Sequence, residues 1–235
     1  MTTASRIGIA LLGMLSPALW ATPAPPPTCS TESLTDYLVS GYECQYGDKI
    51  FSNFTFISSA MGGATAVTSD GVTVAPITDI YGNLGLEFNG SWTANNGQTS
   101  DSAIGFTVSV VAGGPLEIED FGLAQTSGVT GNGSATVSEN GCGPAPCKPG
   151  PLTVITFDLG SNGNQRVNDT IFTPVGSVSV SKDINVVGGT TPQTFSSISV
   201  VEDTFSQTAI PEPVTSAMLG AGLIGIGVLR RKRAH

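Results

Sequence analysis

The chain has 235 residues, a formal net charge of −9 at pH 7 and only 11% charged residues, less than half of the roughly 25% typical of soluble globular domains. Between residues 22 and 210, four basic residues stand against seventeen acidic ones, a net charge of −13. Nucleic acid is therefore excluded as a partner, because phosphate binding requires clustered Lys and Arg. The low charge and the 30 glycines are typical of an all-β extracellular domain.

The N-terminal segment has the order of a secretory signal peptide: a basic residue, an apolar run and small residues. Arg6 precedes an apolar run over residues 7–20, and Ala21 follows it. The run is shorter than the about 20 apolar residues that a membrane span needs. We predict a signal peptide over residues 1–21, removed after Ala21 by signal peptidase during passage through the export translocon, and a Pro-rich linker over residues 22–28. A retained N-terminal anchor is the alternative.

Four cysteines lie in the part expected to be exported: Cys29, Cys44, Cys142 and Cys147. An oxidising compartment lets thiols pair, and proximity in sequence favours Cys29 with Cys44 and Cys142 with Cys147 among the three connectivities. A four-cysteine zinc site is the alternative, although only the second pair approaches a ligand spacing and no histidine lies nearby. We predict two disulfides and no bound metal.

Residues 29–208 are predicted to form one all-β domain of the β-sandwich or jelly-roll type, with one short helix at its start. The helix is expected over residues 31–40, where Leu34, Tyr37 and Leu38 share a face. After it, apolar and polar residues alternate and turn-rich sequence separates the runs, which indicates short strands. The expected strands are residues 50–58, 72–80, 84–92, 104–111, 116–121, 135–139, 152–159, 177–187 and 194–203. Many short strands of this kind are typical of sandwiches and jelly rolls.

The only histidine of the chain is His235, so the expected domain contains none. Ser-His-Asp and Cys-His catalysis and the usual His-bound zinc sites are therefore excluded. Glu117 and Glu119 are two residues apart on an expected strand and share a face, with Asp120 beside them. A glycosidase needs two carboxylates about 5 to 9.5 Å apart, which such a pair satisfies. A solvated strand face explains the same residues, and we predict that the protein is not an enzyme.

Two aromatic residues are candidates for stacking on a sugar ring. Tyr81 lies between two expected strands and Trp92 at the end of one. The alternative is a place in the core, where isolated aromatic residues of strands are more often found.

One oxygen-rich stretch is a candidate Ca²⁺ site, although it lacks the spacing of an EF-hand loop. It consists of Asn162, Gly163, Asn164, Asn168 and Asp169. Calcium is therefore a candidate cofactor, although we predict that the protein needs none.

The C-terminal segment, residues 209–235, has three parts. Pro211, Glu212 and Pro213 come first, and an apolar stretch over residues 214–229 follows them. A basic cluster comes next: Arg230, Arg231, Lys232 and Arg233. As a helix the apolar stretch is about 24 Å long, enough to span a membrane with local thinning or snorkelling arginines. The cations are expected to stay in the cytoplasm, so the domain faces away from it.

This segment, PEPVTSAMLGAGLIGIGVLRRKR, resembles the PEP-CTERM sorting signal of Gram-negative bacteria, a tail also named after the C-terminal domain of an ice-binding protein. The resemblance implies that a membrane protease of the exosortase type cuts near the PEP motif and passes the protein to the cell surface. A plain transmembrane anchor is the alternative. The pattern SLTDYLVSGYECQYGDKIFSNFTF also resembles a recurrent group of PEP-CTERM proteins, which implies one domain with one fold.

Together these features predict a non-enzymatic protein of the bacterial cell surface or extracellular matrix, held in the membrane by its C-terminal helix during transit. A lectin-like module that binds exopolysaccharide is the first alternative. A glycosidase that uses carboxylates is the second.

Overall fold

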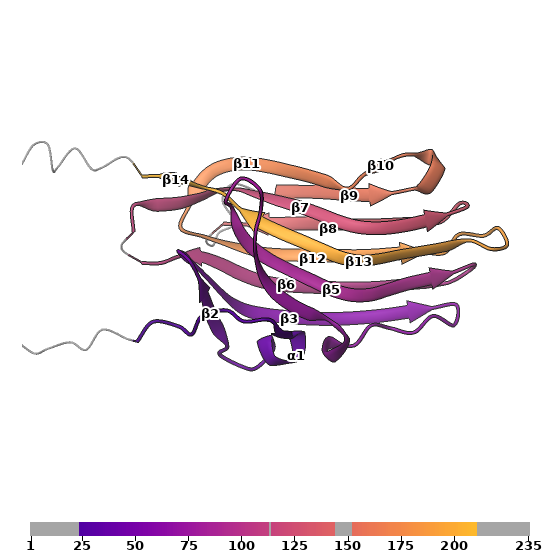
Figure 1. The fold of residues 1–235 in the computed structure, drawn as a ribbon, viewed down its shortest axis with the longest axis horizontal. Coiled ribbons are helices and arrows are strands. Elements are labelled where there is room, and N and C mark those ends of the chain that lie inside the picture. The colour runs from indigo at the N-terminus through magenta and orange to yellow at the C-terminus, as the bar shows by residue number, and fades with distance from the viewer. Residues whose placement is uncertain (1–23, 113, 144–151, 211–235) are drawn as a thin grey trace, which may run out of the picture.

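The computed structural model describes residues 24–112, 114–143 and 152–210, which form two antiparallel β-sheets with a common core (Figure 1). Sheet 1 has the strand order β1-β4-β5-β13-β7-β11, with β14 paired to β7, and sheet 2 has the order β10-β9-β8-β12-β6-β3-β2. The strands of sheet 1 are β1 (Glu32–Ser33), β4 (Thr73–Thr78), β5 (Leu84–Asn95), β7 (Leu116–Thr130), β11 (Val167–Val175), β13 (Phe195–Phe205) and β14 (Gln207–Ala209). The strands of sheet 2 are β2 (Glu43–Tyr46), β3 (Lys49–Met61), β6 (Thr99–Val110), β8 (Ser134–Cys142), β9 (Leu152–Asp158), β10 (Asn164–Gln165) and β12 (Ser177–Val187).

The core lies between the sheets and consists of the apolar residues that alternate with polar ones along each strand. Phe51 and Phe106 from sheet 2 meet Phe88 and Phe205 from sheet 1, and the contacting pairs have ring centroids 5.9 to 6.2 Å apart. Aromatic pairs at such distances stabilise a core beyond the burial of their area. The all-β sandwich predicted from the sequence is therefore confirmed for the described residues.

The N-terminal helix is shorter than predicted. Helix α1 covers only Leu34–Tyr37, whereas the sequence predicted residues 31–40. The preceding residues are extended because β1 pairs with β4, and Ser33 caps the helix by accepting a hydrogen bond from the backbone N–H of Thr35 at 3.1 Å. Leu34 and Tyr37 are buried, as the predicted apolar face requires.

Each of the nine predicted strands coincides with an observed strand, and 177–187 matches β12 residue for residue. β7 is longer than predicted and continues past Phe121 to Thr130, because Leu123 and Gln125 keep the inward alternation. The prediction missed β11 and the short strands β1, β2, β10 and β14. Two short 3₁₀ turns complete the described part: η1 (Ser69–Gly71) and η2 (Gly160–Asn162).

The predicted disulfide between Cys29 and Cys44 is confirmed, and both residues are buried. It ties the segment before β1 to β2, where the backbone N–H of Cys29 also donates to the carbonyl of Gln45 at 2.9 Å. Cys142 is disulfide-bonded as well. Cys147, its predicted partner, lies outside the described residues, so this second pairing stays a prediction.

Replacing both Cys29 and Cys44 with serine is expected to lower the free energy of unfolding by about 3 kcal/mol, because the unfolded chain then regains the entropy of a loop of this length. The sequence separation is 15 residues. Urea unfolding of the oxidised wild type and of the double variant measures the difference. Equal midpoints would contradict a stabilising role for this bond.

The predicted targeting segments lie outside the described residues. These are residues 1–21 with the cleavage site at Ala21, Pro211 to Pro213, the membrane helix 214–229 and the basic cluster 230–233. Within the described residues, no helix is long and apolar enough to cross a membrane. The last described strand, β14, ends at Ala209, and the first and last described residues lie at the same end of the sandwich (Figure 1).

Candidate functional site

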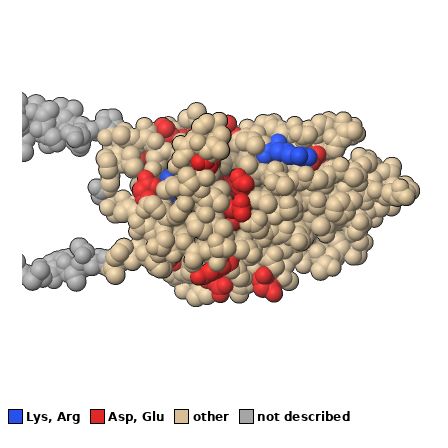
Figure 2. All heavy atoms as spheres, in the orientation of Figure 1, with Lys and Arg blue, Asp and Glu red and all other residues tan. Residues whose placement is uncertain are grey.

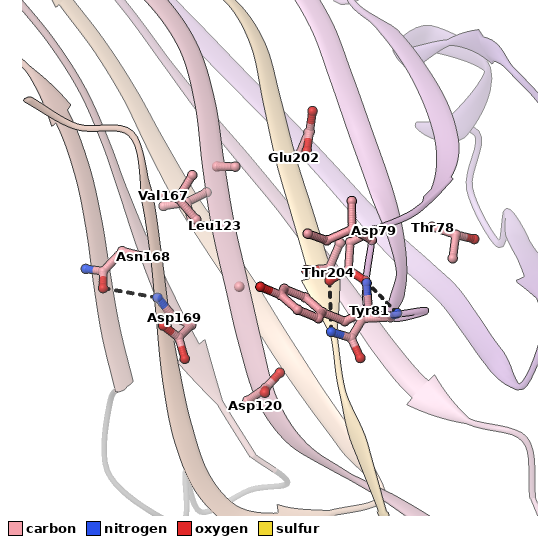
Figure 3. Close-up of a pocket in the computed structure, with 14 residues that line it drawn as sticks. Thr78, Asp79, Tyr81, Asp120, Leu123, Val167, Asn168, Asp169, Glu202 and Thr204 are labelled. Atoms are coloured by element: carbon pink, nitrogen blue, oxygen red, sulfur yellow. Dashed lines mark hydrogen bonds between the residues drawn. The ribbon is translucent and has the colours of Figure 1, made fainter.

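A hollow of about 780 Å³ opens on the outer face of sheet 1, the face that points away from the core. It lies between the turn that joins β4 to β5 and the strands β13, β7 and β11 (Figure 3). We call it the outer hollow. Its volume falls in the range of small-molecule sites, about 300 to 1,000 Å³.

Three residues with small side chains line the floor of the outer hollow: Gly122 and Ala124 on β7 and Thr204 on β13. Thr204 lies directly opposite Gly122, and Asp169 on β11 is the next neighbour beyond Gly122. A Cβ atom at Gly122 would approach the Thr204 hydroxyl to 3.0 Å. Because these neighbouring positions carry small side chains or none, the surface above them is hollow. The order of the strands places the small residues side by side.

Tyr81 stands at one wall of the outer hollow, with 84% of its surface exposed. Its turn is fixed by Asp79, whose Oδ1 accepts the backbone N–H groups of Tyr81 and Asn83, both at 2.8 Å. Oδ2 of the same carboxylate accepts the Asn83 side-chain amide at 2.8 Å. Figure 3 shows the Tyr81 ring directed toward β13 and β7. A large aromatic surface is thus held open to solvent by a braced turn.

Carboxylates from three further elements line the outer hollow: Asp120 on β7, Asp169 on β11 and Glu202 on β13. None of the described lining residues is Lys or Arg. Partial burial and, after it, repulsion from Glu87 raise the pKa of Glu202. Figure 2 shows acidic side chains gathered on the half of this face nearer the ends of the described chain. The hollow therefore offers hydrogen-bond acceptors and repels anions.

Two of the polar side chains are held in place by the backbone. Asp120 Oδ1 accepts the backbone N–H of Ser206 at 2.9 Å. Asn168 donates its amide to the carbonyl of Ile155 at 3.0 Å, and its Oδ1 accepts the backbone N–H of Asp169 at 3.0 Å. Pre-positioned polar groups of this kind lose little entropy when a ligand binds.

The two aromatic candidates of the sequence analysis have different places. Tyr81 lines the outer hollow. Trp92 is fully buried, and its indole N–H donates to the Ser102 hydroxyl at 3.1 Å, so it is a core residue and cannot stack on a sugar. The sequence signal was the same for both, because it consisted only of an aromatic residue at or near the end of a strand.

The carboxylate pair considered for the glycosidase alternative lies outside the hollow. Glu117 and Glu119 are half-buried on β7, and neither lines the outer hollow, whereas Asp120 does. The strict alternation breaks here: Ile118 and Phe121 are both buried with two residues between them. The break occurs where β7 changes its partner from β14 to β13.

The calcium candidates lie on separate elements. Asn162 belongs to η2, Gly163 follows it and Asn164 begins β10, whereas Asn168 and Asp169 lie on β11 beside the outer hollow. Among the described residues, no group of three or more His, Cys, Asp or Glu side chains is placed to hold a metal ion.

Sequence reasoning did not select Glu202 and Thr204. Both occupy outward positions of β13, alternating with buried Val201, Asp203 and Phe205. That alternation indicates that both side chains point away from the core. Their proximity to Tyr81 depends on the order of strands, which local sequence does not specify.

No protein-family model matches this chain, and no curated protein has a significantly similar sequence. Among solved structures, the carbohydrate-binding module TmCBM61 in complex with β-1,4-galactotriose has 10% sequence identity and a TM-score of 0.31, and the match covers 64% of this chain and 88% of that one. The enzymatically active domain of tailspike protein 4 from bacteriophage CBA120 has 15% identity and a TM-score of 0.29, over 66% of this chain and 20% of that one. TM-scores this low transfer neither a ligand nor an activity. The described residues thus form a two-sheet β-sandwich with an acidic outer hollow beside an exposed tyrosine.

Proposed function

We propose that the chain is an exported bacterial surface or matrix protein whose β-sandwich binds a neutral glycan in the outer hollow without acting on it chemically. The observation that carries the proposal is Tyr81, an almost fully exposed aromatic residue braced at the wall of a hollow lined by oxygen acceptors.

The chemistry of a sugar suits this combination of groups. The C–H face of a sugar ring packs on an aromatic surface, and its hydroxyl groups donate to carboxylate oxygens such as those of Asp120 and Asp169. The absence of a cation among the described lining residues and the net charge of the domain disfavour polyanions. A neutral exopolysaccharide is therefore the preferred ligand class.

The proposed route to the surface rests on the two ends of the chain. The signal peptide directs export, the apolar stretch 214–229 holds the protein in the membrane, and the PEP-CTERM resemblance supports transfer by an exosortase-type protease. A disulfide between Cys29 and Cys44 is compatible with an oxidising destination.

Tyr81→Ala is expected to weaken glycan binding by about 2 kcal/mol, or roughly thirtyfold in Kd, which is the usual effect of truncating an aromatic anchor. A glycan array with the purified full-length protein identifies the ligand, and titration calorimetry with wild type and variant measures the change. Phe195→Ala is the matched control, because Phe195 is a partly exposed aromatic residue of β13 that does not line the hollow. The control is expected to bind like wild type.

Two results would contradict the proposal. One is an array without any bound glycan, and the other is equal affinity of Tyr81→Ala and wild type. Release of shortened glycans would instead support the glycosidase alternative. Glu202→Gln and Asp120→Asn would then be expected to abolish the release, while Glu117→Gln and Glu119→Gln would leave it unchanged, because only the first two residues line the hollow.

A further inference from the structure

Three charged residues meet in the core, far from solvent. Lys182 on β12 lies directly opposite Glu139 on β8 in sheet 2, and Asp203 reaches them from β13 of sheet 1. All three side chains have 0% exposure. The Lys182 Nζ atom is 3.3 Å from Glu139 Oε2 and contacts Asp203 Oδ2. We call these residues the core triad.

The surroundings of the core triad are aromatic. Lys182 Nζ lies 4.7 Å from the ring centroid of Phe88 and 5.3 Å from that of Phe106. Phe88 belongs to sheet 1 and Phe106 to sheet 2, so the amine is enclosed between the two sheets. An apolar shell of this kind penalises charge and excludes water.

An ordinary ion pair leaves the core triad incompletely satisfied. One lysine faces two carboxyl groups, and the second oxygen of each, Glu139 Oε1 and Asp203 Oδ1, is buried without a hydrogen-bond partner. Buried charged groups are normally paired, and the large majority of their polar atoms are hydrogen-bonded, because a buried atom without a partner destabilises the fold. A salt bridge alone therefore does not account for the arrangement of these three residues.

We propose that Lys182 and Asp203 are joined by an intramolecular amide bond between Nζ and Cγ, and that Glu139 transfers the proton during its formation. The bond would connect the two sheets of the sandwich covalently. It would close a loop between residues that are 21 positions apart in the sequence.

The reaction needs no external reagent. The lone pair of the neutral Lys182 amine attacks Cγ of the protonated Asp203 carboxyl, and the carbonyl π electrons move to oxygen. Glu139 takes one proton from the nitrogen and gives it to the hydroxyl group of the tetrahedral intermediate. The C–O bond then breaks, water leaves, and Glu139 returns to its initial state. Amine and carboxylic acid thus yield amide and one water molecule, with no change in oxidation state.

Burial favours the protonation states that this step requires. Desolvation lowers the pKa of the Lys182 ammonium, which favours the neutral nucleophile. Desolvation also raises the pKa of the Glu139 carboxyl, which makes its carboxylate a stronger base for the proton on nitrogen. The proximity of nitrogen and carboxyl group in a fixed core replaces the external activation that amide formation needs in solution.

The test is a peptide map of the full-length protein after denaturation, reduction and alkylation. Chymotryptic cleavage after Phe172, Phe195 and Phe205 places Lys182 in the peptide 173–195 and Asp203 in the peptide 196–205. With the amide bond, the two appear as one branched species, lighter than their sum by one water molecule. The peptide map is needed because the intact mass alone is ambiguous. Dehydration at a sequence such as Asp70-Gly71 lowers the intact mass by one water molecule as well, but it produces no branched species. Two separate peptides of unmodified mass would overturn the proposal.

Two variants test the chemistry. Asp203→Asn is expected to form the same branched species, identical in mass to that of wild type, because ammonia then leaves instead of water. Glu139→Gln is expected to yield mainly the two separate peptides, since the proton carrier is lost. Cross-linking of Glu139→Gln to the wild-type extent would overturn the role of Glu139.

A matched control uses another buried carboxylate. Asp158 is 1% exposed and pairs with Arg166 at 2.6 Å, away from the core triad. Asp158→Asn is expected to keep the branched species. Should Glu139→Gln fail to fold, the wild-type and Asp203→Asn maps still decide whether the bond exists. The core triad is separate from the outer hollow, so glycan binding and cross-linking succeed or fail independently.

Discussion

Lys182→Met is expected to lower the free energy of unfolding by about 3 to 5 kcal/mol, because it leaves Glu139 and Asp203 buried without the nitrogen that both contact in the wild type. Both carboxyl groups are fully buried, and the variant loses every contact of the Lys182 nitrogen with them. Such a change is a large fraction of the roughly 5 to 15 kcal/mol by which domains are stable. Chemical denaturation of wild type and variant at neutral pH measures it.

Lys49→Met is the matched control for this substitution. Lys49 is also buried, with 2% side-chain exposure, but its partner Asp48 has 37% exposure and stays solvated when the lysine is removed. The loss of stability is therefore expected to be clearly smaller. Equal losses in the two variants would show that the core triad has no special role.

The effect of Lys182→Met is expected to shrink in acid. Burial raises the pKa of Glu139 in the folded protein above its ordinary value of 4.5. A carboxyl group with a raised folded-state pKa binds more protons in the folded than in the unfolded state, so its cost to stability grows as the pH rises between the two pKa values. Below the ordinary value the carboxyl is neutral in both states, and this part of the penalty disappears. A penalty that stays constant with pH would contradict buried ionisation.

Replacing the whole core triad with apolar residues is expected to recover much of the loss. Buried ion pairs and triads exchanged for apolar residues of similar volume are often neutral or stabilising. Lys182→Met combined with Glu139→Leu and Asp203→Leu leaves no buried charge at this place. If the triple variant is no more stable than Lys182→Met alone, the loss comes from packing rather than from unpaired charge.

The alternation of each strand is enough to indicate that the three residues of the core triad point into the core. In β12 the inward positions are Val178, Val180, Lys182, Ile184 and Val186, so the lysine occupies the apolar phase of the alternation. A charged residue in that phase is unusual, because lysine and acidic residues are rarely fully buried unless they are paired. Glu139 likewise occupies an inward position after Ala135 and Val137, and Asp203 occupies one between Val201 and Phe205.

Local sequence does not show which residues of the core triad contact one another. Glu139 and Lys182 meet because β8 and β12 are neighbours although 43 residues separate the pair, and Asp203 comes from the other sheet. The outer hollow has the same origin, since the turn with Tyr81 and the strand with Thr204 are brought together by the order β5-β13-β7. Strand type follows from alternation, whereas strand order is set by packing of the whole domain.

The missed strand β11 shows where alternation fails as a predictor. At this edge of sheet 1, Val167 and Ile171 are exposed and only Phe172 is buried. Pro174 near its end also lowers the expectation of a strand, and prolines in sheets are found mainly at edges. An edge strand with one buried residue carries almost no periodic signal.

Replacing Pro211, Glu212 and Pro213 together with alanine is expected to block release of the protein from the membrane while leaving its insertion intact. In the proposed tail, we expect insertion to depend on burial of the apolar side chains of residues 214–229, and orientation to depend on the cost of moving the cations of residues 230–233 across lipid. Neither requires the PEP motif. From the sequence, we expect the two prolines to favour an extended backbone around Glu212, a shape suited to a protease cleft, and Pro213 to suit the first position of a helix.

The measurement is a pulse-chase of the full-length protein in its host, with membrane and released fractions separated and the released form identified by mass spectrometry. Wild type is expected to be released without residues 230–233, and the triple-alanine variant is expected to accumulate uncleaved in the membrane. Replacing the four basic residues with serine is the contrasting variant, since it removes the cytoplasmic charge and is expected to disturb retention and orientation instead. Release of the triple-alanine protein at the wild-type rate would show that the segment is an ordinary anchor, because the apolar stretch and its charges alone would then account for all that the tail does.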